Sequence, residues 1–136
     1  MEPRRLFRHL RVQFSITCRV TYVTEGRSMA WPTSRRLKIN LHSPLGIPFV
    51  CLHEFAHLVA EQRAPDRGHW HRAIFRRALL DVIHAAGLAA ADYPWHREYA
   101  SLARWAERRG LAAGPTCVGT PRRVFPRALI LPTTAE

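Results

Sequence analysis

Cysteine is scarce in this sequence and long apolar runs are absent, and both shortages exclude classes of protein. The three cysteines, Cys18, Cys51 and Cys117, are widely spaced along 136 residues. They form neither a C-x-x-C pair nor an even disulfide framework, which favours a reducing compartment. No apolar stretch approaches the roughly 18 residues of a membrane span, and the first residues lack the features of a secretory signal. We therefore expect a cytoplasmic protein that has no membrane partner.

Acidic residues and lysine are also scarce. Ten Asp and Glu oppose 21 Lys and Arg, which gives a net charge of +11, and Lys38 is the only lysine. Arginine makes bidentate contacts with phosphate, and such a charge on a small domain favours association with nucleic acid. The alternative is a solvated arginine-rich surface without a partner. No aromatic–basic nucleic-acid motif is visible along the chain, so the expected binding is non-specific.

The spacing of the apolar residues predicts one α+β domain over residues 1–110. Apolar and polar side chains alternate between residues 12 and 22, and shorter alternating stretches follow at 28–31 and 35–41. This alternation has the period of a half-buried strand. We therefore expect a small antiparallel β-meander at the beginning of the domain.

Proline, aspartate and glycine residues mark the ends of three helices that should follow the strands. The expected helices cover about residues 48–63, 66–86 and 92–110, with Pro48 in a first turn, Asp66 as a cap and Gly87 as a terminator. Residues 111–136 form a proline-rich basic C-terminal tail in this interpretation.

The stretch CLHEFAHLVAEQ, residues 51–62, places an H-E-x-x-H motif on the first expected helix. Residues four apart share a helix face, so His53 and His57 can bind one metal ion together. Glu54 lies beside them, where its carboxylate reaches a water molecule rather than the ion. Zinc lowers the pKa of such a water to near neutrality, and a glutamate can remove its proton during hydrolysis. The motif predicts a zinc site with Glu54 as the general base.

A third ligand is needed to complete a catalytic zinc site. Ala60 and Arg63 stand where a metzincin would have glycine and histidine, and both methionines precede the motif, so that class is excluded. On the second expected helix, His71 lies in the middle of the apolar stripe, whereas His69 points away from it and Asp81 lies at its edge. This helical geometry predicts His71 as the third ligand, with His69 and Asp81 as the alternatives.

The pattern resembles the SprT-like zinc metallopeptidases and their small minigluzincin-type relatives. The resemblance covers about residues 35–83, and it rests on VCLHEFAHLVA and on His71 followed four residues later by Phe75. Arg72 replaces the glycine that usually follows the histidine in that family. The resemblance implies a zincin-like fold, a zinc ion held by three histidines and a catalytic glutamate. These residues carry over as His53, His57, His71 and Glu54.

The leading hypothesis is a zinc metallopeptidase that hydrolyses a protein or peptide substrate, with DNA-associated proteins as one class that the resemblance implies. Tyr93, Tyr99 or an arginine is expected to donate to the oxyanion. One alternative is a nucleic-acid-binding or interaction module whose zinc site is structural or vestigial. Others are a repressor-cleaving peptidase of the ImmA/IrrE type, which usually relies on a downstream acidic ligand, and a hydrolase of non-peptide amides. The intact Glu54 favours an enzyme, because a structural metal site does not need it.

Overall fold

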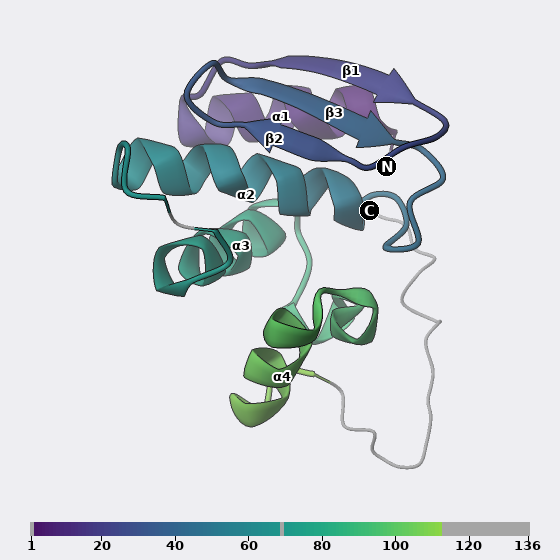
Figure 1. Cartoon of the computed structure of the whole chain (residues 1–136), viewed down its shortest axis with the longest axis vertical. Helices are drawn as coiled ribbons and strands as arrows, with labels where there is room; N and C mark the ends of the chain where they lie inside the picture. The colour runs from purple at the N-terminus through teal and green to yellow at the C-terminus, as the bar shows by residue number, and fades with distance from the viewer. Residues whose placement is uncertain (1, 69, 113–136) are drawn as a thin grey trace.

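The computed structural model describes residues 2–68 and 70–112, and it shows an α+β domain in which a three-stranded sheet covers a central helix (Figure 1). The elements in chain order are α1 (Pro3–Phe14), β1 (Arg19–Val23), β2 (Met29–Trp31), β3 (Arg36–Asn40), α2 (Phe49–Arg63), α3 (Ala73–Ala85), the short 3₁₀ helices η1 (Ala90–Asp92) and η2 (Trp95–Arg97), and α4 (Ala100–Arg108). The α+β class is confirmed. Among the described residues, no helix has the length and apolarity needed to cross a membrane. Nearly all of the tail predicted at 111–136 lies outside the described residues.

Helix α1 occupies part of the segment for which a strand is predicted, so the strand predicted from residue 12 is wrong at its beginning. The Glu2 side chain caps this helix by accepting a backbone hydrogen bond from Arg4 at 2.6 Å. Leu6 and Leu10, together with Phe7, form its buried face. Val12 begins the alternating pattern in the sequence, yet it is 72% exposed on the helix surface. The alternation of apolar and polar residues therefore predicts a strand correctly only from β1 onward.

The sheet is mixed, so the predicted antiparallel meander is wrong in its topology. Its strand order is β1-β3-β2, with β1 parallel to β3 and β2 antiparallel to β3. The stretches predicted at 28–31 and 35–41 are confirmed as β2 and β3. Strand β3 is central because Leu37 and Ile39 are 1% and 0% exposed, whereas the side chains of β1 and β2 are partly buried or exposed.

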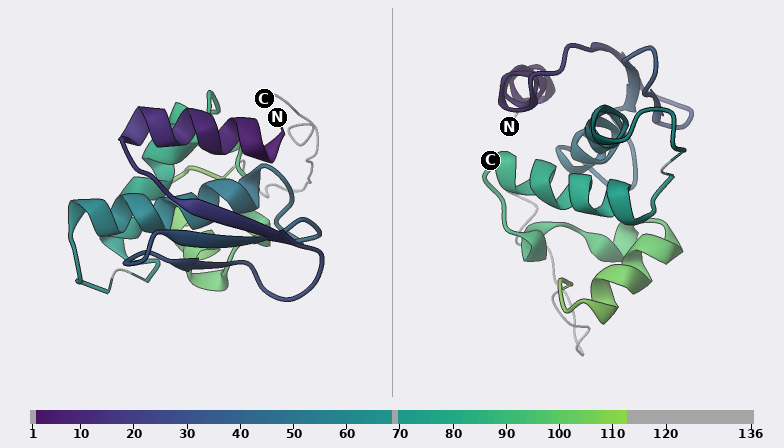
Figure 2. Two further views of the ribbon diagram at one scale, coloured as in Figure 1. Left: turned by 90° about the horizontal axis from the view of Figure 1, so that it is seen from above. Right: turned by 90° about the vertical axis from the view of Figure 1, so that its left-hand side faces the viewer.

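Helix α2 is the helix predicted at 48–63, and it forms the centre of the domain. Every residue from Phe49 to Ala60 is buried, so this helix has no solvent-facing side over its first three turns. It contacts β2 and β3 on one side and α1 and α3 on others, and Figure 2 shows these elements around it. Any polar side chain on this part of α2 is therefore enclosed by protein.

The other two predicted helices are shorter than the sequence suggests. Helix α3 begins at Ala73 rather than near Asp66, because Asp66 and His71 have left-handed backbone angles, φ 58° and 59°, that interrupt a right-handed helix. It ends before Gly87, as predicted, and the φ of 84° there suits glycine. The predicted helix at 92–110 is wrong in its first part, where η2 and a short connection precede α4. That connection carries Glu98 and Tyr99 back toward α2.

Candidate metal centre

The first two predicted ligands, His53 and His57, lie on one side of α2 with ring centroids 5.3 Å apart. They are 3% and 6% exposed. Phe75 of α3 packs against both, with centroid distances of 5.1 Å to His53 and 4.3 Å to His57. Helix α3 therefore fixes the two imidazole rings in the enclosed space beside α2.

His71 joins this pair from the connection before α3, not from a helix. Its Nε2 lies 3.0 Å from Nε2 of His53, and its ring centroid is 5.2 Å from that of His57. Arg76 donates from Nε to the backbone carbonyl of His71 at 2.9 Å, and the Trp70 indole stacks on the His71 ring. The predicted position of His71 on a helix is wrong. The connection nevertheless carries the side chain toward α2.

The three histidines suit a metal ion that prefers nitrogen ligands. One ligand atom from each lies within 4.8 Å of the others. In a tetrahedral site with Zn–N distances near 2.0–2.1 Å, two ligand nitrogens are about 3.3 Å apart, close to the 3.0 Å between His53 and His71. Three histidines that can hold a metal ion are thus brought together, although this geometry does not specify which metal.

Charge also favours a cation between His53 and His71. Burial and the nearby charge of His53 lower the pKa of His71 to about 4, so its ring is neutral at pH 7 and keeps a lone pair. Burial alone would lower the pKa of His53, but the hydrogen bond and charge of Glu98 outweigh it and raise that pKa. The neutral His71 ring can therefore bind a metal ion without first losing a proton.

The sequence also offered Asp81 and His69 as alternative third ligands. Asp81 of α3 forms an ion pair with Arg63 at 2.8 Å and lies 3.9 Å from Nε of Arg77. Its carboxylate is occupied at the surface and is 34% exposed, so it does not join the histidines. His69 lies outside the described residues.

Glu98 is a part of the site that the sequence analysis missed. His53 Nδ1 donates to Oε2 of Glu98 at 2.6 Å, and the Tyr93 hydroxyl donates to the same oxygen. Burial raises the pKa of Glu98, but the hydrogen bond and charge of His53 together with the hydrogen bonds from Tyr93 and the Tyr99 backbone outweigh it. The net effect lowers the pKa of Glu98 and keeps its carboxylate ionised. A proton held on Nδ1 leaves the Nε2 lone pair of His53 directed toward His71. No sequence motif predicts this contact, because Glu98 follows His53 by 45 residues.

We expect Glu98→Gln to weaken zinc affinity about 10- to 100-fold, because an amide holds the Nδ1 proton less strongly than a carboxylate. The measurement is competition for zinc against a chromophoric chelator. Glu107→Gln, which changes an exposed carboxylate on α4, is the matched control. Equal affinity in the two variants would contradict a positioning role for Glu98.

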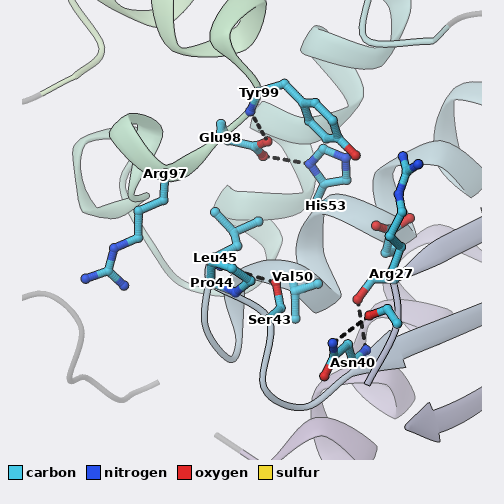
Figure 3. Close-up of a pocket in the computed structure, with 13 residues that line it drawn as sticks. Arg27, Asn40, Ser43, Pro44, Leu45, Val50, His53, Arg97, Glu98 and Tyr99 are labelled. Carbon is cyan, nitrogen blue, oxygen red and sulfur yellow. Dashed lines mark hydrogen bonds and ion pairs between the residues drawn. The ribbon is translucent and has the colours of Figure 1, made fainter. Parts of the chain in front are cut away.

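Glu54 lies at the wall of a cavity of about 360 Å³. The same cavity reaches His53, Glu98 and Tyr99, which are labelled in Figure 3. Glu54 is 7% exposed, and its carboxylate makes no hydrogen bond to any other described residue. Burial raises the pKa of Glu54 to about 7, against the opposing charge of His53. The cavity continues past Arg27 and over an apolar wall that includes Leu45 and Val50. A substrate in this cavity would meet Glu54 next to His53, the one of the three histidines that lines it.

Two exposed aromatic side chains flank the histidines. Trp70 is 63% exposed and stacks on His57 and His71 with centroid distances of 5.5 and 4.9 Å. Tyr99 is 49% exposed, and its ring centroid lies 4.7 Å from that of His71 and 5.9 Å from that of His53. Tyr93, in contrast, is 3% exposed and is engaged by Glu98. Of the two predicted tyrosine donors, only Tyr99 is open to a ligand.

Comparison of the chain with protein-family models, with curated proteins and with solved structures gives no match.

Proposed function

We propose that this protein is a zinc-dependent metallopeptidase, with His53, His57 and His71 as zinc ligands and Glu54 as the general base. The observation that supports this function best is the buried carboxylate of Glu54 beside the three histidines. Burying a carboxylate that accepts no hydrogen bond from any described residue is costly, and a structural metal site gains nothing from it. An enzyme gains a base that faces its substrate cavity.

The residues around the cavity have distinct parts in the proposed reaction. When bound, a zinc ion supplies Lewis acidity and acidifies water in its open position. Glu54 takes a proton from the attacking water and passes it to the leaving amine, for which a pKa of about 7 is well suited. Glu98 orients His53. The apolar wall around Leu45 and Val50 offers room for a substrate side chain.

We assign the oxyanion donor of this proposal to Tyr99, because its exposed ring lies against His53 and His71. Tyr99→Phe is expected to lower kcat about a hundredfold, with zinc content and KM little changed, since the donor acts mainly in the transition state. Steady-state kinetics with Tyr22→Phe, on β1, as the control measure this effect. An unchanged kcat would assign the donor elsewhere.

The peptidase proposal is tested by incubating the zinc-loaded chain with reduced, unfolded casein and identifying new termini by mass spectrometry. We expect cleavage that a chelator stops and added zinc restores. Zinc binding without new termini would instead favour the structural or vestigial site. An ImmA/IrrE-type peptidase has less support, because Asp81, the downstream acidic candidate, is paired with Arg63. The proposal includes the interpretation that this protein is a SprT-like zinc metallopeptidase.

A further inference from the structure

The outer face of the sheet carries basic side chains and no carboxylate among its strand residues. In the strand register, Arg19, Arg36 and Trp31 form one row across β1, β3 and β2. The next row consists of Thr21, Lys38 and Met29. These side chains share one face, because side chains alternate along a strand and paired residues point the same way. The opposite face holds Leu37 and Ile39, which are buried.

This outer face is open among the described residues. Arg19, Thr21 and Arg36 are exposed, and Met29 is 37% exposed. Figure 2 shows the sheet as an outer layer with α2 on its inner side, and α2 contacts β2 and β3. The face is therefore available to a partner on the side of the sheet away from α2.

The charged strand residues of this face are all basic. Residues 19–40 contain one acidic residue, Glu25, which lies in the connection between β1 and β2. Arg35 adds a further positive charge immediately before β3, where its Nη1 donates to Thr17 Oγ1 at 3.4 Å. Four cations, on Arg19, Arg35, Arg36 and Lys38, thus gather on or beside one small surface.

An aromatic ring lies within this basic surface. The guanidinium of Arg36 sits over the Trp31 ring with its Cζ 4.7 Å from the ring centroid. Indole rings and guanidinium planes both stack with nucleobases, and basic side chains beside them neutralise phosphates. An acidic polypeptide would match the charge of this surface, but it has no nucleobase that could stack on the Trp31–Arg36 pair. Duplex DNA keeps its bases paired and would use only the charges.

We infer that the outer face of the sheet binds single-stranded nucleic acid without strong sequence preference. Arg19, Arg36 and Lys38 contact phosphates, and the Trp31–Arg36 pair stacks with an unpaired base. This binding goes beyond the proposed peptidase function and does not depend on it. The site is separated from the metal centre by the thickness of the sheet and α2.

The test is fluorescence anisotropy of the full chain with labelled oligo-dT and oligo-U of about 20 nucleotides, between about 50 and 200 mM salt. The variant Arg36→Glu/Lys38→Glu reverses two charges on the face. Its matched control is Arg104→Glu/Arg108→Glu on α4, which changes the net charge equally and lies far from the sheet (Figure 1). Circular dichroism checks that both variants keep the fold.

We expect the sheet variant to lose at least about tenfold in affinity and the control to lose much less. The dependence of log affinity on log salt should become shallower by about 1.4, since two phosphate contacts are removed. No oligo-dT or oligo-U binding by the wild type at low salt, or equal losses in the two variants, would overturn the inference. Equal affinity for a duplex, or effective competition by polyglutamate at the same charge concentration, would also overturn it.

Discussion

Glu54→Gln is expected to lower the rate of peptide hydrolysis about 10²- to 10⁴-fold while the protein still binds zinc. The amide has nearly the shape of the carboxylate but cannot accept a proton from water. The candidate metal ligands are the three histidines and do not include Glu54. The loss should therefore appear in kcat rather than in metal content. Cleavage of unfolded casein and zinc content, measured on the same preparation, separate the two quantities.

Two features make this experiment decisive. Glu107→Gln removes an exposed carboxylate of α4 and should leave the rate unchanged, which controls for the loss of one negative charge. The buried position of Glu54 makes a fold check necessary, and circular dichroism provides it. A zinc-loaded Glu54→Gln protein that still cleaves at the wild-type rate would remove Glu54 from the mechanism.

Replacing His53, His57 or His71 with alanine is expected to abolish tight zinc binding. Each variant has only two imidazoles left, so the zinc ion loses one of its four tetrahedral ligands. The wild type should retain about one zinc ion per chain, and each variant should retain almost none. Zinc at about a thousand times its Kd should stabilise the wild type by about 4 kcal/mol, and this gain should vanish in the variants. Elemental analysis and thermal unfolding with and without zinc measure both effects.

His84→Ala is the matched control, because His84 is an exposed histidine of α3 away from the cluster. His71→Ala is the most informative variant, since His71 precedes α3 and its loss leaves α2 intact. If His71→Ala bound zinc as tightly as the wild type, the three histidines would not act as one ligand set, and the peptidase proposal would lose its three-histidine zinc site.

Several parts of this molecule follow directly from local sequence. Pro48 and the apolar residues after it predict α2, and the helical period places His53 and His57 on one side of it. The alternation in 35–41 predicts β3, because Leu37 and Ile39 must face the interior. These predictions succeed because short-range geometry alone decides them.

Other parts depend on contacts between distant residues. The parallel pairing of β1 with β3 depends on which strand is most buried, and a local pattern does not contain that information. Glu98 reaches His53 from the connection after η2, in a segment that the sequence predicted to be helix. The basic face went unnoticed as a motif because Arg19, Trp31 and Arg36 become neighbours only through strand pairing. His71 was predicted to face α2 for a wrong reason, since its left-handed backbone lies outside α3.

The enclosure of α2 on every side also constrains how this chain can change over evolutionary time. Ala56 and Ala60 are 0% exposed and carry no reactive group, yet a larger side chain at either position would push the helix away from its neighbours. We therefore expect the amino-acid sequence to change most slowly along the whole stretch from Phe49 to Ala60, not just at its histidines and glutamate. Related chains that keep the motif should also keep small residues at these two positions.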